Sequence, residues 1–172
     1  MLHNIEIKAR ISSLDTMTKR IGALDAGPAQ HVSQDDTFFH CNAGRLKLRV
    51  TPDGAGQLVY YTRADRTGPK ASSYLLVPVT SPDPLREALT LAYGQAGRVR
   101  KRRVVYLIGR TRIHLDTVET LGTFLELEVV LEANEAIEDG VREAEALMTR
   151  LGIEPSQLVA SSYLELLQES SV

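Results

Sequence analysis

Residues 4–10 read NIEIKAR, a stretch in which polar and apolar side chains alternate one by one. This period of two is typical of a β-strand, because successive side chains of a strand point to opposite faces. Ile5 and Ile7 would then face a hydrophobic core, and the charged side chains between and beyond them would face the other side. On this basis we predict a strand over residues 3–11.

The same alternation continues along most of the chain. Glycine-rich turns, such as the one at residues 54–56, separate the alternating segments. The further expected strands cover residues 32–41, 45–50, 57–63, 72–79, 101–108, 110–116 and 123–131. About eight strands joined by short turns predict mainly antiparallel pairing.

Four segments have the 3.6-residue periodicity of an amphipathic helix instead. They are a helix capped by Ser13, a helix starting at Asp83-Pro84, residues 138–151, and a helix from about Pro155 to Gln168 with a break near Ala160. The expected fold class is therefore α+β. We expect a single domain over residues 1–172, because no repeat, low-complexity tract or long linker divides the chain.

Composition and charge exclude several classes of protein. The chain has 172 residues, 43% of them hydrophobic, and a net charge of −2, which argues against a nucleic-acid-coating protein. No apolar run approaches the roughly 20 residues that span a bilayer, so we expect no membrane partner. The charged N-terminus is unlike a signal peptide, and the single cysteine, Cys41, argues for a reducing compartment. We therefore expect a cytoplasmic protein.

The charged faces of the expected strands are segregated by sign. Arg45, Lys47 and Arg49 lie in a row on one strand, whereas Glu126 and Glu128 lie together on another. Charges on the solvent-facing side of an antiparallel sheet need no function, and that interpretation remains open for any single strand. If the faces converge, however, the sheet encloses a cavity with cations for phosphate oxygens and carboxylates for Mg²⁺ or Mn²⁺. A triphosphate bound as its metal complex would require both sets.

The ordered motifs resemble those of the CYTH superfamily, also called triphosphate tunnel metalloenzymes. They are NIEIKAR (4–10), QDDTFF (34–39), GRLKLR (44–49), KRRVVYLIGRTRIHLD (101–116), ETLGTFLELEV (119–129) and SSYLELL (161–167). The set covers nearly the whole chain and is most similar to the CyaB-type branch, which includes class IV adenylyl cyclases. The resemblance implies a closed antiparallel β-barrel, or tunnel, of about eight strands with flanking helices.

The resemblance also implies roles for individual residues. The metal ligands would be Glu6, Asp116, Glu126 and Glu128. The triphosphate would be bound by Lys8, Arg45, Lys47, Arg49, Arg63, Lys101, Arg103 and Arg112. Among these, we expect Lys8, Arg49 and Arg103 to be catalytic.

Two positions complicate this assignment. The first glutamate of the family motif E-x-E-x-K is Asn4 here, and an amide brings no charge, so metal binding at that end should be weaker. His114 could approach a phosphate or relay a proton. A histidine in such a place is more often part of a hydrogen-bonded strand face, and we favour that interpretation.

Three functions remain open at this point. The first is a metal-dependent enzyme that cleaves a triphosphate, most like a class IV adenylyl cyclase, with an organic or inorganic triphosphatase as the alternative. The second is a module that binds nucleotide or polyphosphate without turnover. The third is a structural β-protein. The expected partner is a triphosphate-bearing small molecule, and the apolar outer faces of the strands could support a homodimer.

Overall fold

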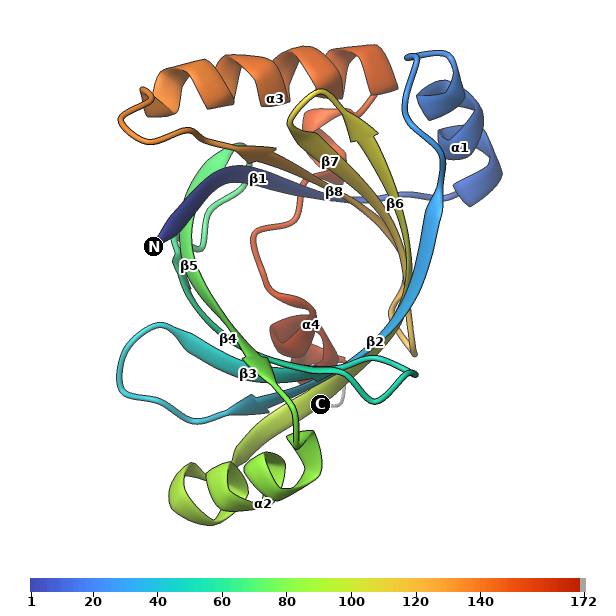
Figure 1. The fold of residues 1–172 in the computed structure, drawn as a ribbon. Helices are drawn as coiled ribbons and strands as arrows, with labels where there is room; N and C mark the ends of the chain where they lie inside the picture. Colours follow the sequence, from blue (N-terminus) through green and yellow to red (C-terminus); the bar gives the residue numbers. More distant parts are fainter. Residues whose placement is uncertain (171–172) are drawn as a thin grey trace.

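The computed structural model describes residues 1–170, which form a closed antiparallel barrel with helices on its outside (Figure 1). The strands are β1 (Leu2–Arg10), β2 (Gln30–Phe39), β3 (Arg45–Val50), β4 (Gly56–Arg63), β5 (Lys70–Val79), β6 (Gln95–Ile108), β7 (Thr111–Val118) and β8 (Gly122–Val130). The helices are α1 (Leu14–Gly22), α2 (Pro82–Tyr93), α3 (Ile137–Leu151), the 3₁₀ turn η1 (Pro155–Gln157) and α4 (Tyr163–Glu169). The predicted fold class is confirmed, and only residues 171–172 of the expected domain lie outside the described chain.

The barrel closes in the order β1-β5-β4-β3-β2-β6-β7-β8. All neighbours are antiparallel, and closure depends on β1, which pairs with β5 on one side and β8 on the other. Strand β6 is longer than predicted because it begins at Gln95, directly after α2, and it pairs with β2 from Gln95 to Val105. This pairing passes a bulge at Phe38 and Phe39, where Gly97 adopts a positive φ of 154°.

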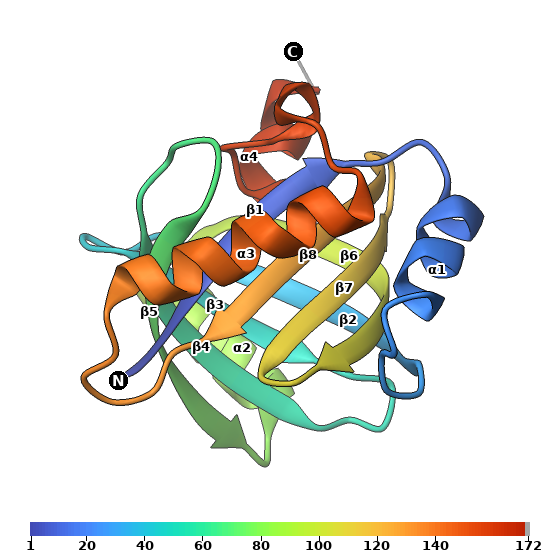
Figure 2. The ribbon, with the colours of Figure 1, turned by 90° about the horizontal axis from the view of Figure 1, so that it is seen from above.

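Two helices cover one side of the barrel and bury the outer apolar face there. Figure 2 shows α3 lying across the strands, with α1 beside it. Ile7, Leu125 and Ile113 point outward from their strands and pack with Leu147 and Leu151 of α3 in one buried cluster. The alternation in the sequence therefore divides the two faces as expected, with apolar side chains outside under the helices and polar ones inside.

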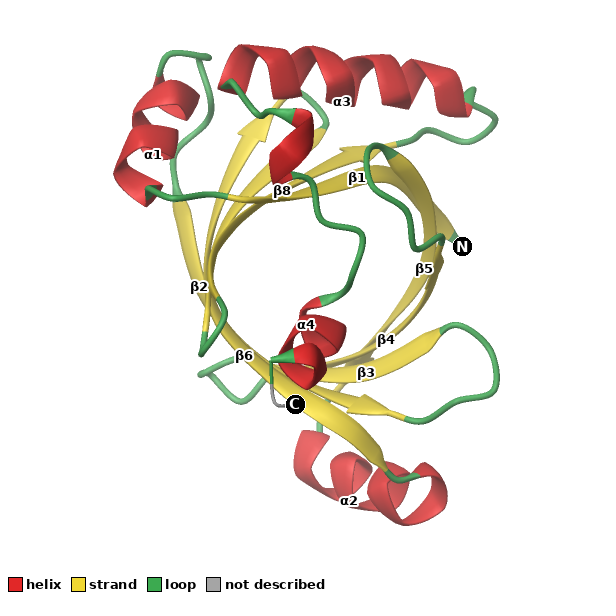
Figure 3. Ribbon diagram, turned by 180° about the vertical axis from the view of Figure 1, so that it is seen from behind, coloured by secondary structure: helices red, strands yellow, loops and turns green. Residues whose placement is uncertain are grey.

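The C-terminal segment has the predicted break near Ala160, but the break is longer and the part before it is shorter than expected. Instead of one broken helix from Pro155 to Gln168, the chain forms η1, then runs without helical structure over residues 158–162, and then forms α4. Ser162 ends the irregular stretch with a capping box, in which its hydroxyl accepts from the backbone N–H of Glu165 and the Glu165 carboxylate accepts from the backbone N–H of Ser162. This irregular stretch crosses one end of the barrel (Figure 3). Among the described residues, no helix is both long and apolar enough to cross a membrane.

Truncation of Leu151 tests the packing of α3 on the barrel. Leu151 is fully buried, so Leu151→Ala should lower the free energy of unfolding by about 2–5 kcal/mol through lost burial and the cavity left behind. Leu91→Ala on α2 is the control, because Leu91 is 82% exposed and its truncation should change stability by less than about 0.5 kcal/mol. Urea unfolding measures both, and equal effects would contradict the packing described.

Candidate functional site: a charged tunnel

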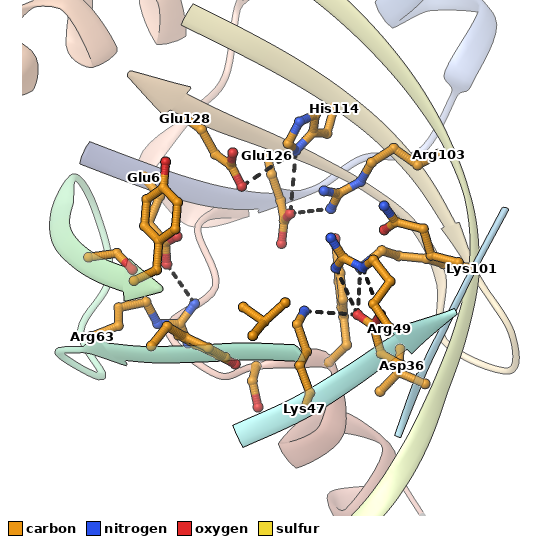
Figure 4. Close-up of a pocket in the computed structure, with 18 of the residues that line it drawn as sticks. Glu6, Asp36, Lys47, Arg49, Arg63, Lys101, Arg103, His114, Glu126 and Glu128 are labelled. Carbon is orange, nitrogen blue, oxygen red and sulfur yellow. Dashed lines mark hydrogen bonds and ion pairs between the residues drawn. The ribbon is translucent and has the colours of Figure 1, made fainter. Parts of the chain in front are cut away.

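The barrel encloses a cavity of about 380 Å³ lined by the inward faces of its strands. Figure 4 shows charged side chains from several strands pointing into this space. Of the described residues, seven cationic side chains line the cavity: Lys8, Lys47, Arg49, Arg63, Lys101, Arg103 and Arg112. Four carboxylates line it as well: Glu6, Asp36, Glu126 and Glu128. The lining therefore carries an excess of three positive charges when its lysines are protonated, which suits a polyanion.

Asp36 of β2 organises the cations on one wall of the tunnel. Its carboxylate is 1% exposed and accepts from Lys47 Nζ at 2.8 Å and Arg49 Nε at 2.8 Å, with Lys101 Nζ at 3.6 Å. Burial alone would raise the pKa of Asp36, but these three cations outweigh it and hold the pKa well below its usual range. One carboxylate thus holds three phosphate-binding candidates at one place.

The two lysines of this group give up their protons more readily than a lysine in water does. Burial, followed by the charge of Arg49, lowers the pKa of Lys47 to about 7, although Asp36 acts in the opposite direction. The Lys101 pKa is also lowered, first by burial and then by Arg103. A bound phosphate would place negative charge beside these two lysines and so favour their protonated form.

Arg103 of β6 bridges two carboxylates at the centre of the tunnel. It donates to Asp116 from Nε at 2.7 Å and from Nη2 at 2.6 Å, and Nη2 also donates to Glu126 Oε2 at 2.5 Å. The Tyr163 hydroxyl donates to Asp116 at 2.9 Å. Asp116 is therefore fully occupied by Arg103 and Tyr163, and it orients Arg103 rather than facing the cavity.

Three side chains on β7 and β8 that could bind a metal ion lie together: His114, Glu126 and Glu128. No other group of three or more such side chains is found among the described residues. One ligand atom from each lies within 4.8 Å of the others. His114 Nδ1 is buried, accepts or donates no hydrogen bond among the described residues, and lies 3.8 Å from an oxygen of each glutamate. Burial tends to raise the pKa of Glu126, but Arg103, then His114 and then Lys8 outweigh it and hold the pKa well below its usual range. An unpaired buried nitrogen beside two ionised carboxylates fits a divalent cation.

The C-terminal segment closes one end of the tunnel through its backbone. The Ser161 carbonyl accepts from Lys8 Nζ at 3.0 Å, and the Ala160 carbonyl accepts from Arg63 Nη2 at 3.2 Å and Lys70 Nζ at 3.3 Å. Arg63 also donates to Glu6 at 2.9 Å, and burial is the main reason that the pKa of Glu6 is raised. Residues 159–163 thus form a closed end in which these cations are held by carbonyl oxygens.

The structure gathers most of the predicted site residues. Ten of them line the cavity: Glu6, Lys8, Lys47, Arg49, Arg63, Lys101, Arg103, Arg112, Glu126 and Glu128. Two do not. Asp116 lies behind Arg103, and Arg45 lies beyond the closed end, where it donates to Asp65 and Glu165. The alternation along β3 predicts that Arg45 points inward, as Lys47 and Arg49 do. At the level of Arg45, however, α4 covers the barrel wall.

Sequence reasoning did not place three residues of this site in it. Asp36 lies in the quoted motif QDDTFF, and its acidic character next to basic strands was a usable signal. His114 is placed with two glutamates, contrary to the favoured interpretation of a hydrogen-bonded strand face. Tyr163 comes from the C-terminal segment, and its ring lies 4.0 Å from Lys8 Nζ, a contact that no strand periodicity could predict.

Comparisons with known proteins agree with this architecture. A model of the CYTH domain matches residues 2–163. Adenylate cyclase CyaB of Aeromonas hydrophila is 29% identical over 174 residues, covering 96% of this chain and 89% of that protein. The structure of the PH1012 protein from Pyrococcus horikoshii OT3 has a TM-score of 0.85 at 25% identity, covering 95% of this chain and 98% of its own. HpAC1 from Hippeastrum, named an adenylyl cyclase and reported with a dominant triphosphatase activity, has a TM-score of 0.62 at 17% identity, covering 97% and 96%.

Removal of the Asp36 charge tests whether this carboxylate holds the cationic wall together. Asp36→Asn should lower the free energy of unfolding at pH 7 by about 3–5 kcal/mol, because buried cations lose their partner. The pKa of Asp36 is depressed in the folded state, so its contribution is present above the unfolded pKa near 3.9 and is lost as pH falls through the lower folded value. The difference in the free energy of unfolding between variant and wild type should therefore shrink below about pH 4.

Glu87→Gln is the matched control, because Glu87 is exposed on α2. Denaturant unfolding between pH 3 and pH 8 measures all three proteins. If the loss of stability in Asp36→Asn did not change with pH, or was no larger than in Glu87→Gln, Asp36 would not anchor the cations.

Proposed function

This protein belongs to the CYTH domain family, and on that premise we propose that it is a metal-dependent enzyme that binds the triphosphate group of its substrate inside the barrel and cleaves it. One observation carries the proposal: seven cationic side chains and the group His114, Glu126 and Glu128 line the same cavity. A pure anion-binding site can use a carboxylate such as Asp36 to orient its cations, but it has no use for two glutamates gathered beside an unpaired histidine nitrogen. A metal–triphosphate complex uses both.

The cations on the Asp36 wall would bind the phosphate oxygens. Lys47, Arg49 and Lys101 already converge on one carboxylate, so a phosphoryl group can take up the same donors. Arg103 lies between this wall and Glu126, where it would orient the reacting phosphoryl group. Lys8 and Arg63 would neutralise charge nearer the closed end, and Arg112 would do so from the opposite side of the cavity.

The donor set of His114, Glu126 and Glu128 would hold Mg²⁺ or Mn²⁺, since carboxylate oxygens are the ligands that both ions prefer. When bound, the ion would neutralise phosphate charge and polarise a phosphorus–oxygen bond. Glu6 faces the same cavity but is engaged by Arg63, so in the metal-free chain it belongs to the phosphate side of the site. Asn4 is not part of the acidic group, and the group remains complete without a carboxylate at that position.

The reaction that we favour is that of an adenylyl cyclase, on the strength of the similarity to CyaB of Aeromonas hydrophila over nearly the whole chain. The ribose 3′ oxygen of ATP would form a bond to the α-phosphorus, the bond from that phosphorus to the β-bridging oxygen would break, and pyrophosphate would leave. The 3′ hydroxyl proton would pass to solvent. Triphosphate hydrolysis is the second candidate, because HpAC1 of Hippeastrum has the same fold and a dominant triphosphatase activity.

Product analysis tests the proposal. Purified protein is incubated with Mg²⁺ or Mn²⁺ and, separately, with ATP, tripolyphosphate and thiamine triphosphate. Cyclic AMP with pyrophosphate would support the cyclase, and orthophosphate would support the triphosphatase. Ligand-induced thermal stabilisation without any product would contradict an enzyme and favour a binding module.

Neutralisation of the acidic group should separate turnover from binding. Glu126→Gln and Glu128→Gln should each reduce kcat by more than about 100-fold, since each removes a charged metal ligand. The triphosphate should still stabilise both variants thermally, because the cations remain. Glu119→Gln, on a side chain that is 66% exposed, should keep wild-type kcat. Wild-type turnover in either tunnel variant would exclude this group from catalysis.

The lowered pKa of Lys47 predicts a pH dependence of binding. Above about pH 7 the free tunnel holds neutral Lys47, whereas a bound phosphate favours its charged form. Binding should therefore take up a proton, and affinity should fall by up to about tenfold per pH unit above pH 7. The ligand's last phosphate pKa lies near 6, so its own charge is constant there.

Calorimetric titration at pH 8 in two buffers of different ionisation enthalpy measures the proton uptake. In Lys47→Arg the side chain stays charged, so the uptake attributed to this position should disappear. The same uptake in wild type and Lys47→Arg would assign the proton to another group.

A further inference from the structure

One side chain of the C-terminal segment contacts charged residues from several strands of the tunnel. Tyr163 is the first residue of α4, is 6% exposed and lines the cavity. Its hydroxyl donates to Asp116 Oδ2 at 2.9 Å, and the same oxygen accepts from Arg103 Nη2 at 2.6 Å. The centroid of its ring lies 4.0 Å from Lys8 Nζ and 5.2 Å from Lys101 Nζ. Tyr163 therefore contacts side chains of the site that come from β1, β6 and β7.

The position of Tyr163 is fixed by contacts on both sides of it along the chain. The capping box formed by Ser162 and Glu165 begins α4 around it. Before it, the backbone N–H of Val159 donates to a backbone carbonyl of β1 at 2.9 Å. The ring of Phe124 packs edge-on against the Tyr163 ring, with centroids 5.0 Å apart. A side chain that is held in this way can in turn hold its neighbours in one orientation.

Packing accounts for the ring of Tyr163 but not for its hydroxyl. The ring belongs to a buried apolar cluster with Phe38 and Phe124, where a phenylalanine would fill the same space. The hydroxyl contacts Asp116, which is 0% exposed. Burial alone would raise the pKa of Asp116, but Arg103 outweighs it and lowers the pKa. The ionised carboxylate only accepts hydrogen bonds, so the hydroxyl donates and fixes the orientation of the carboxylate that holds Arg103.

The ring of Tyr163 also acts on two cations of the tunnel. An aromatic face attracts an ammonium group, and the attraction is strongest where water is excluded. Lys8 and Lys101 are in such a place, because burial is the first cause that lowers the pKa of each. An uncharged ring holds an ammonium group in position without neutralising it, so its charge remains available to a phosphate.

We propose that Tyr163 is a positioning residue for cleavage of the triphosphate. Its hydroxyl acts through Asp116 to hold Arg103 in the orientation that the reacting phosphoryl group requires. Its ring holds Lys8 and Lys101 where they bind phosphate oxygens. This inference rests on the proposed function, because it takes the triphosphate to bind among these cations. Loss of the hydroxyl should therefore slow turnover without weakening binding, whereas loss of the ring should weaken binding as well.

Two substitutions separate the hydroxyl from the ring. Tyr163→Phe keeps the ring and its packing, so kcat should fall about 10- to 100-fold while the affinity for tripolyphosphate stays within about twofold. Tyr163→Leu also removes the ring and should weaken tripolyphosphate binding about 5- to 30-fold. The turnover assay uses the triphosphate that the wild type cleaves fastest. Affinity is measured by calorimetric titration with EDTA, where metal-dependent turnover does not consume the ligand.

Tyr106→Phe is the matched control, because Tyr106 packs against the apolar cluster outside the barrel and its variant should keep wild-type kcat and affinity. A double-mutant cycle tests the route through Asp116. In the Asp116→Asn background, Tyr163→Phe should lower kcat by less than about twofold, since the hydroxyl has lost the carboxylate through which it acts.

Three results would overturn the inference and leave the proposed function intact. They are wild-type kcat in Tyr163→Phe, an equal loss of kcat and tripolyphosphate affinity in that variant, and an undiminished further loss of kcat in the Asp116→Asn background. Tyr163→Phe preserves the packing, so it decides the matter even if Tyr163→Leu does not fold. If the wild-type chain cleaves no triphosphate, the proposed function fails, and this inference fails with it.

Discussion

The barrel depends on the pairing of charges that its closure removes from water. A buried unpaired charge costs several kcal/mol, and roughly as much again is lost when one partner of a buried pair is removed. Asp36 shows how the chain meets this constraint, because it holds Lys47 and Arg49 at hydrogen-bond distance while itself 1% exposed. Arg103 does the same for Asp116 and Glu126. The tunnel is thus a set of internal ion pairs arranged around a central cavity.

This arrangement leaves the tunnel ready to exchange partners. A phosphate oxygen can replace a carboxylate oxygen on Lys47 or Arg49 without either cation moving to a new environment. A metal ion can bind Glu126 and Glu128 when Arg103 and Lys8 bind phosphate in place of Glu126. At the closed end, the carbonyl groups of residues 160 and 161 accept hydrogen bonds from Arg63 and Lys8, and a phosphate oxygen could replace these carbonyl oxygens as well. The cations then keep their positions while their partners change, and such preorganised donors are the condition for electrostatic catalysis.

Much of this could be predicted from the sequence, because strand alternation is a local property. The residues that alternate along 45–50 and 123–131 do point inward and outward as their parity requires. The alternation does not predict how far along the barrel axis a side chain lies. Arg45 has the inward parity of Lys47, but it lies two residues nearer the end that α4 covers and pairs with Glu165 there. The closed end itself depends on Tyr163 and the irregular segment before it, whose contacts join residues 47 and 153 positions apart and leave no periodic trace.

The most direct test of the account is a crystal structure of the wild-type chain with Mn²⁺ and a triphosphate. We predict phosphate density inside the barrel among Lys47, Arg49 and Lys101, with the Asp36 contacts lengthened, and an anomalous manganese peak at His114, Glu126 and Glu128. Phosphate bound only on the outer surface, for example at Arg98 and Arg100, would contradict the account. So would an interior that keeps all its ion pairs at saturating ligand.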